Sequence, residues 1–276
     1  MAGRALVLGG GGVTGVAWEI GVLAGLAADG VDLSTADLVV GTSAGSVVGA
    51  QLRSGVPAEE MFHRQLAGYG AEVTARLSAL TMARWAWAVM RSRDPQRARA
   101  RVGRMALRSR TMPESERRAV IEARLTKHEW PAGRLLITAV DAETGEFVAF
   151  DRDSGVPLVD AVGASCALPG VWPPVTIDGR RYVDGGVRSP ANVDLAGGCE
   201  RIVVLAPTSG GGPFASLARQ VSRLRDRSRV VQVTPDADAR RAIGRNVLDP
   251  VRRAAAARAG RAQAAAVSPA VHEIWG

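Results

Sequence analysis

The sequence is poor in residues that cross-link chains, and it lacks a long hydrophobic run. Its 276 residues include only two cysteines, Cys166 and Cys199. Two such cysteines provide neither a disulfide framework nor the spacing of a metal site, so we expect both to be small buried residues. The longest strongly apolar stretch, residues 16–28, contains Glu19 and is too short to span a membrane.

The amino terminus also lacks the pattern of a secretory signal. The stretch "MAGRALVLGG" leads directly into an apolar segment, without a charged region, an extended apolar core and a cleavage site. We therefore expect a cytoplasmic protein, with peripheral contact at the inner membrane surface as a further option.

Positive charge is concentrated in one segment. Residues 84–118 contain eleven arginines against three acidic residues, an excess that equals the +8 of the whole chain. Such a local excess of positive charge suits an anionic partner, which could be nucleic acid, an anionic membrane surface or an acidic substrate. Because the segment has no zinc-finger or recognition-helix signature, we expect no nucleic-acid binding.

Strand and helix patterns alternate at the start of the chain. Residues 4–8 are typical of a short buried strand and precede a helical pattern over about 14–28. Residues 38–40 repeat the strand pattern, and a helix to about Arg53 follows. This alternation predicts an α/β fold, with a parallel sheet covered by helices on both faces.

The rest of the chain predicts one domain over residues 1–276. Helical composition dominates 58–129, with breaks at Pro95 and Pro113, and residues 134–140 and 146–150 predict a hairpin. Later strands are expected in "RYVDGG", "RIVVLAP" and "RVVQVTP", followed by a basic helix over about 250–266. We expect a core over about 4–206, a helical basic insertion over about 58–130, and a C-terminal strand and helix over about 229–268.

A serine lies on the turn between the second strand and its helix. The sequence "GTSAG", Gly41 to Gly45, matches G-x-S-x-G in that context. Such a turn holds the nucleophile in a strained conformation with its hydroxyl exposed, and the flanking glycines let strand and helix approach closely. The helix N-terminus favours the negative charge that develops during attack. We therefore predict that Ser43 is a nucleophile.

The partner of Ser43 is predicted to be a carboxylate. His63, His128 and His272 lie in the helical region or near the end of the chain, and we expect them to be surface or packing residues. Asp184 in "RRYVDGGVRSP" ends a short strand before two glycines, and a buried carboxylate can accept a serine proton. The alternative is an ordinary turn aspartate before Gly-Gly.

The first glycine-rich loop fits two kinds of ligand. Gly10, Gly12 and Gly15 satisfy G-x-G-x-x-G, but a dinucleotide site needs an acid at the end of the second strand, and Asp37 precedes that strand. The free N–H groups of the loop suit an oxyanion as well as a phosphate.

Taken in order, the three motifs resemble those of bacterial patatin-like phospholipases. The family's G-G-G-x-R/K-G loop corresponds to Gly10–Gly15, its G-x-S-x-G elbow to Gly41–Gly45, and its D-G-G/A motif to Asp184–Gly186. The stretch "GASCALPGVWPPV" is similar to the family's small-residue passage upstream of the aspartate. The resemblance covers about residues 4–206 and is weakest over 58–130.

The resemblance implies a three-layer α/β/α fold with a mainly parallel central sheet. It implies hydrolysis of acyl esters in phospholipids or related lipids, by Ser43 as nucleophile and Asp184 as base, without metal or diffusible cofactor. The remaining implied roles are an oxyanion hole at Gly10, Gly11 and Gly12, an elbow framed by Gly41 and Gly45, and supporting positions at Thr14, Gly15, Gly185 and Gly186. Thr14 replaces the family's basic residue, so a role of that cation in head-group binding is in doubt.

Two questions stay open at this point. A catalytically weak lipid-binding protein or a nucleotide-binding regulator could use the same glycine loop. In the segment 80–118, Leu80, Ala83, Trp87 and Met90 share one helical face, which suits either an anionic membrane surface or an apolar stripe packed on the core. The oligomeric state and the physiological ester are not predicted.

Overall fold

The computed structural model describes residues 3–67, 74–208 and 216–276. In this part of the chain one sheet has the strand order β5-β6-β3-β2-β1-β7-β8, and β4 pairs with β3. The strands are β1 Arg4–Leu8, β2 Leu38–Gly41, β3 Arg134–Asp141, β4 Phe147–Phe150, β5 Val175–Ile177, β6 Arg180–Asp184, β7 Arg201–Leu205 and β8 Arg229–Val233. The helices are α1 Gly12–Ala28, α2 Ala44–Arg53, α3 Ala58–Ala67, α4 Ala79–Met90, α5 Pro95–Leu107, α6 Glu114–Arg124, α7 Leu158–Ser165, α8 Leu217–Arg225, α9 Ala237–Ile243 and α10 Arg253–Trp275.

The centre of the sheet is parallel and one edge is antiparallel. The neighbouring pairs in β3-β2-β1-β7-β8 run parallel, whereas β4 and β6 are antiparallel to β3, and β5 to β6. Apolar side chains on both faces of β1 and β7 are buried, as a sheet covered on both sides requires. The predicted hairpin forms as β3 and β4, and the predicted mainly parallel sheet is confirmed.

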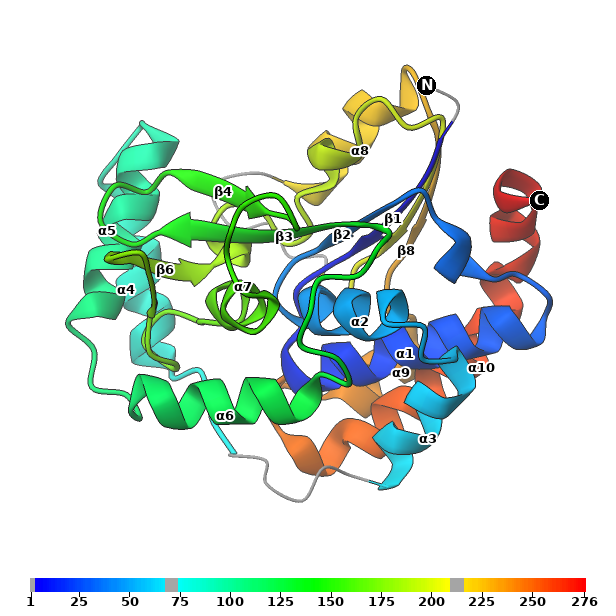
Figure 1. The fold of residues 1–276 in the computed structure, drawn as a ribbon, viewed down its shortest axis with the longest axis horizontal. Coiled ribbons are helices and arrows are strands. Elements are labelled where there is room, and N and C mark those ends of the chain that lie inside the picture. Colours follow the sequence, from blue (N-terminus) through cyan, green and yellow to red (C-terminus); the bar gives the residue numbers. More distant parts are fainter. Residues whose placement is uncertain (1–2, 68–73, 209–215) are drawn as a thin grey trace.

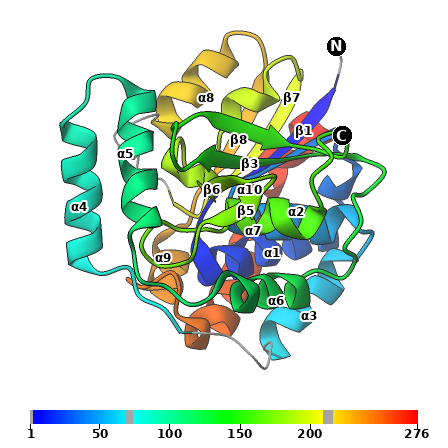
Figure 2. The ribbon, with the colours of Figure 1, turned by 60° about the vertical axis from the view of Figure 1, so that its left-hand side comes forward.

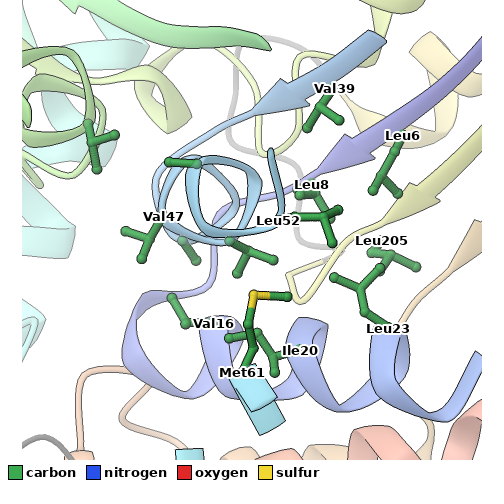
Figure 3. Packing of buried hydrophobic residues seen from close by; sticks show 14 of the residues in the cluster. Leu6, Leu8, Val16, Ile20, Leu23, Val39, Val47, Leu52, Met61 and Leu205 are labelled. Atoms are coloured by element: carbon green, nitrogen blue, oxygen red, sulfur yellow. The ribbon is translucent and has the colours of Figure 1, made fainter. Parts of the chain in front are cut away.

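Helices cover both faces and make a three-layer α/β/α fold (Figures 1 and 2). On one face α1, α2, α7 and α10 pack over Leu6, Leu8, Val39 and Ile137. Figure 3 shows part of this core, with Val16 and Ile20 on the side of α1 that faces α2 and, beyond it, the strands. On the other face α8 lies over β7 and β8, and α5 lies over β3 and β6.

Helix α10 is longer than the sequence indicates. It continues from Arg253 to Trp275 through Pro269, whereas the predicted helix ended at about residue 266. Proline removes one hydrogen bond within the helix. Burial of Val271 and Trp275, and a 3.0 Å hydrogen bond from Trp275 Nε1 to the Asp32 carbonyl oxygen, hold the last turns in place.

Helices α1 and α10 pack with their backbones in close contact. A Cβ atom on Gly21 would lie 2.1 Å from the Ala257 carbonyl oxygen, and one on Gly260 would lie 2.3 Å from the Trp18 carbonyl oxygen. Only glycine permits this approach. This close packing holds α1 in position. Because the first turn of α1 belongs to the glycine loop, it also holds that loop in position.

The basic insertion contains α3 to α6. Pro95 is the first residue of α5, and Pro113 immediately precedes α6, so both predicted breaks are helix starts. Three further helices in the described residues, α7, α8 and α9, have no counterpart in the sequence prediction. None of the helices in the described residues combines the length and hydropathy that crossing a bilayer requires.

Of the two roles left open for the apolar stripe of α4, packing on the core is contradicted at Trp87 and Met90. Trp87 is 59% exposed and Met90 79% exposed, while α4 packs through Ala88 and Val89, with Trp85 partly buried beside them. The Leu80 side chain lies outside what the structure describes. Helical periodicity identified an apolar face but did not show which face meets the core.

Candidate active site

Ser43 occupies a strained turn between β2 and α2. Its φ is +52°, in the region that L-residues rarely adopt, and its backbone conformation is fixed by close packing on both sides. A Cβ on Gly41 would lie 2.6 Å from Ser46 Cα, and one on Gly45 would lie 2.1 Å from the Leu8 carbonyl oxygen. The predicted strand–turn–helix context of Ser43 is therefore present.

Asp184 is the last residue of β6, and its side chain contacts Ser43. Ser43 Oγ donates a 2.7 Å hydrogen bond to Asp184 Oδ2, and the Gly186 N–H donates a 2.7 Å bond to Asp184 Oδ1. A Cβ on Gly185 would lie 2.2 Å from Thr138 Oγ1, so glycine lets this turn lie against β3. The structure brings together the serine and the aspartate that the sequence singled out.

Burial makes the Asp184 carboxylate a stronger base than an ordinary aspartate. Loss of solvent raises the pKa of Asp184 from 3.8 to about 6, although the hydrogen bonds from Ser43 and Gly186 act in the opposite direction. The group is therefore ionised at neutral pH. Its basicity lies in a range that suits general-base chemistry.

The glycine loop lies beside Ser43 at the carboxyl ends of β1 and β2, which pair in register at Leu8 and Gly41. The Gly10 N–H donates to the Pro190 carbonyl oxygen at 2.7 Å, so this amide is engaged within the fold. Within the described residues, the amides of Gly11 and Gly12 donate to no other group. They belong to the N-terminus of α1, where free N–H groups favour a negative charge.

Thr14 and Gly15 support this loop from inside the fold. Thr14 is fully buried, and its hydroxyl donates a 3.2 Å hydrogen bond to the Val247 carbonyl oxygen. The Gly15 N–H donates to the Gly11 carbonyl oxygen at 2.9 Å. The loop therefore carries no cation at the position of Thr14.

Two polar residues that sequence reasoning missed hold the site together. Ser165 Oγ accepts a 2.9 Å hydrogen bond from the Ser43 N–H. Buried Asn192 donates through Nδ2 to Thr42 Oγ1 at 3.0 Å and to the Gly185 carbonyl oxygen at 3.3 Å. Asn192 thereby connects the serine turn with the aspartate turn. Ser165 lies in the noted "GASCALPG" passage, whereas no local pattern in the sequence marks Asn192.

The two cysteines and the histidines His63 and His128 contact other groups of the fold, and neither histidine contacts Ser43 or Asp184 in the described residues. Both cysteines are free. Cys166 is buried, as expected, with Sγ donating to the Ser43 carbonyl oxygen at 3.3 Å, whereas the expected burial of Cys199 is wrong, since this residue is partly exposed. Burial raises the pKa of the Cys166 thiol. His63 and His128 lie near Glu59 and Glu122 respectively, as partly exposed side chains.

A cavity of about 550 Å³ opens onto Ser43 and Asp184. Its walls are largely apolar, with side chains from α4, α5 and the segment after α7, among them Trp85, Val102 and Trp172. Such a lining suits the acyl chain of an ester. In the described residues no three His, Cys, Asp or Glu side chains gather as metal ligands.

The family profile "Patatin-like phospholipase" matches residues 6–197, a range that includes the glycine loop, the Ser43 turn and Asp184. The chain belongs to the patatin-like phospholipase family. The match extends over most of the chain and confirms the resemblance and the fold class that the three motifs predicted.

Relatives of this patatin-like chain include proteins named only by family. Uncharacterized NTE family proteins of Mycobacterium tuberculosis (strain H37Rv) and Mycobacterium bovis are 29% identical over 207 residues, which is 75% of this chain and 49% of each relative. The chain thus spans about half the length of the curated relatives it matches. The crystal structure of VipD from Legionella pneumophila is similar in fold, with a TM-score of 0.50 and 14% identity, over 98% of this chain and 67% of VipD.

Proposed function

We propose that the protein hydrolyses acyl ester bonds of phospholipids or related lipids through a Ser43–Asp184 dyad. The observation that supports this most directly is the 2.7 Å hydrogen bond from the Ser43 hydroxyl to a buried carboxylate whose pKa is raised to about 6. Membership in a family of lipid acyl hydrolases supports the reaction class. We extend the proposal to the whole chain as a single patatin-like domain.

In the proposed acylation step, Asp184 accepts the hydroxyl proton as Ser43 Oγ attacks the ester carbonyl carbon. The negative charge that develops on the carbonyl oxygen is stabilised by the amides of Gly11 and Gly12 at the α1 N-terminus. The Gly10 amide, which the family resemblance also placed in the oxyanion hole, is left out of the proposed site because it already donates to the Pro190 carbonyl oxygen. Collapse of the intermediate breaks the ester C–O bond, and the alcohol leaves with the proton from Asp184.

In the proposed deacylation step, water replaces the alcohol. Asp184 accepts a proton from water as its oxygen attacks the acyl-Ser43 carbonyl carbon, through the same oxyanion site. The Ser43 oxygen then leaves and recovers the proton from Asp184, and the fatty acid is released. In this proposal the apolar cavity walls hold the acyl chain in both steps. Neither step requires a diffusible cofactor, because Ser43, Asp184 and water account for every bond and proton.

The alternative readings of the glycine loop are less well supported. A nucleotide site needs an acid for the ribose hydroxyls at the end of β2, and that strand ends in Gly41 followed by Thr42 and Ser43. A catalytically weak lipid-binding protein would share the cavity but would not need a basic carboxylate on the serine hydroxyl.

A substrate panel tests the proposed function. The purified protein is assayed on phospholipids, lysophospholipids, acylglycerols and short nitrophenyl esters, with fatty-acid release as the measurement. We expect turnover of at least one lipid class. Folded protein that binds lipid and releases no fatty acid from any class contradicts the proposal and favours a lipid-binding role.

The activity is expected to depend on the ionisation of Asp184. Protonated Asp184 cannot accept the serine proton, so kcat/KM should fall as the pH drops below about 6, the pKa of this group. The measurement is a profile of kcat/KM from about pH 4.5 to 8, with circular dichroism at each pH to exclude unfolding. A profile that stays flat down to pH 4.5, as an aspartate with the ordinary pKa of 3.8 would give, contradicts the assignment.

We further propose that α4 places the protein on anionic membranes at the cytoplasmic surface. Helix α4 lies at the periphery of the molecule beside α5 in both views (Figures 1 and 2). Its outer side exposes Trp87 and Met90, and the Arg91 guanidinium lies 4.7 Å from the Trp87 ring centroid. Apolar side chains among arginines suit the boundary between acyl chains and anionic head groups. Met82, 50% exposed, lies on the same helix and lines the cavity of Ser43.

Replacing Trp87 and Met90 together with serine is expected to weaken binding to anionic vesicles about 10-fold, because buried apolar area at the interface is lost. Co-sedimentation with vesicles of phosphatidylglycerol and phosphatidylcholine measures this. Val251→Ser is the matched control, since Val251 is 87% exposed outside α4. Equal binding to anionic and neutral vesicles, or equal binding of the double variant and wild type, contradicts the membrane proposal.

A further inference from the structure

Arg188 lies close to the aspartate turn but outside the cavity of Ser43. It follows the short turn 185–187, and neither Arg188 nor Asn192 is among the described residues that line the cavity. The Arg188 side chain instead contacts buried Asn192, where Nη1 donates a 2.8 Å hydrogen bond to Asn192 Oδ1. A cation outside the cavity is therefore joined to the residue that connects the two catalytic turns.

The Arg188 guanidinium is itself fixed on two sides. It forms hydrogen bonds of 2.9 and 2.5 Å with the two oxygens of Asp194, and its carbon lies 4.2 Å from the centroid of the Phe147 ring. Paired bonds to one carboxylate and a stacked ring set the plane of a guanidinium. Gln220 of α8 holds the same carboxylate, since its Nε2 donates to Asp194 Oδ1 at 2.7 Å. Arg188 therefore presents one N–H to Asn192 in a defined direction.

Asn192 has a backbone conformation that few residues adopt. It is fully buried, and its φ and ψ are +48° and +43°, in the left-handed region where asparagine is better tolerated than most side chains. Its Nδ2 donates to Thr42 Oγ1 and to the Gly185 carbonyl oxygen. Those two residues are the chain neighbours of Ser43 and Asp184. One side chain therefore sets the spacing between the two turns.

The charge of Arg188 determines which end of the Asn192 amide faces the turns. An asparagine amide has one acceptor end and one donor end. Reversing it would turn the NH₂ group towards the guanidinium, which has no acceptor, and Oδ1 towards the Gly185 carbonyl oxygen. Buried polar groups without a partner are costly. Arg188 therefore stabilises the orientation in which Asn192 donates to both turns.

We propose that Arg188 and Asn192 are positioning residues for the dyad. The guanidinium holds the Asn192 amide, the amide holds the turns that carry the dyad, and Ser43 Oγ thereby stays 2.7 Å from Asp184 Oδ2. This inference rests on the proposed hydrolase function and names the residues that maintain its geometry. Because neither side chain lines the cavity, their loss should affect the chemical step and leave substrate binding unchanged.

Steady-state kinetics on the lipid class that the panel shows to be turned over fastest test the proposal. Asn192→Gly removes the amide, and glycine adopts the left-handed backbone without strain. We expect its kcat to fall roughly 10- to 100-fold with KM unchanged, because displacing a reacting group by about an ångström costs about 100-fold. A loss that appears in KM alone, or wild-type kcat in folded Asn192→Gly, overturns the proposal.

Variants of Arg188 test the second positioning residue. Arg188→Met removes the donor to Asn192 and should lower kcat by roughly 10-fold, by a smaller displacement of the same turns. Arg188→Lys should recover part of this loss, because it retains a charged donor without the planar fork. Each variant is first checked by thermal unfolding, and the Arg188 pair carries the test if Asn192→Gly does not fold. Wild-type kcat in folded Arg188→Met overturns the role of Arg188.

A double variant tests whether Arg188 acts through Asn192. Arg188→Met in the Asn192→Gly background should lower kcat no further, whereas independent effects multiply and would overturn the proposed connection. Arg229→Met is the matched control and should keep wild-type kcat. Arg229 also pairs with a carboxylate, Glu273 at 2.7 Å. It starts β8, at the end of the parallel strands opposite to the end that carries Ser43.

Crystal structures separate this inference from the proposed function, because the geometry of the dyad can be measured without turnover. In Asn192→Gly we expect the distance from Ser43 Oγ to Asp184 Oδ2 to exceed about 3.0 Å, the upper end for a hydroxyl hydrogen bond. An unchanged distance overturns the inference even if esters are hydrolysed. A lengthened distance supports it, and if wild-type protein then hydrolyses no ester, the proposed function alone is contradicted.

Discussion

Replacing Ser43 with alanine is expected to lower kcat for lipid esters by roughly 10⁴- to 10⁶-fold, the scale seen when a catalytic serine is removed. The hydroxyl is the group that Asp184 contacts at 2.7 Å. The adjacent Cys166 cannot replace it, because its raised pKa keeps the thiol protonated and Sγ is engaged with the Ser43 carbonyl oxygen. Fatty-acid release measured with the preferred substrate gives the comparison.

Ser54→Ala is the control for this experiment. Ser54 follows the other end of α2 and bonds within that helix, to the Ala50 carbonyl oxygen at 2.7 Å. Its variant should keep wild-type activity. Ser43→Ala protein that is folded and retains more than about one hundredth of the wild-type kcat contradicts the role of Ser43, because removal of a nucleophile costs far more.

Replacing Asp184 with asparagine is expected to lower kcat by roughly 10²- to 10⁴-fold, the usual contribution of a general base. The amide oxygen can still accept a hydrogen bond from Ser43 but cannot take its proton at neutral pH. Activity close to wild type in this variant contradicts the dyad, provided that Ser43→Ala is inactive. Asp178→Asn in the β5–β6 turn is the matched control, since Asp178 is exposed and outside the cavity.

The same Asp184→Asn variant is expected to be more stable than wild type above pH 6. Folding raises the pKa of Asp184 from 3.8 to about 6, so the folded state binds this proton more tightly and stability falls as the pH rises through that window. Asparagine removes this dependence. The gain in unfolding free energy at neutral pH is at most about 3 kcal/mol, from 1.36 kcal/mol per pKa unit. Thermal unfolding against pH measures it, and a lower melting temperature for the variant at pH 7 contradicts the burial argument.

The sequence predicted those parts of the site in which the backbone geometry of a single turn requires particular residues close together in the chain. The Ser43 turn needs glycines at positions 41 and 45 because the neighbouring backbone leaves no room for a Cβ, and that requirement is visible as a motif. Asp184 lies 141 residues away in the chain from Ser43. Its own turn, closed by Gly185 against β3, still leaves a recognisable Asp-Gly-Gly pattern.

The rest of the site depends on tertiary packing that leaves no local pattern. Asn192 connects two turns from a loop of its own, and Arg117 reaches the cavity only because α6 lies beside it. The exposed apolar stripe of α4 is a second case in which tertiary packing decides. Helical periodicity placed Trp87 and Met90 on one face of the helix but did not show that this face meets solvent.

The most direct test of the account is labelling with a fluorophosphonate, which forms a stable adduct with an activated serine. Folded wild-type protein is treated with the probe, digested and analysed by peptide mass spectrometry. We predict one adduct, on Ser43, that is absent from Ser43→Ala and forms much more slowly in Asp184→Asn. An adduct on a different residue, or no adduct on folded wild-type protein, contradicts the Ser43–Asp184 dyad.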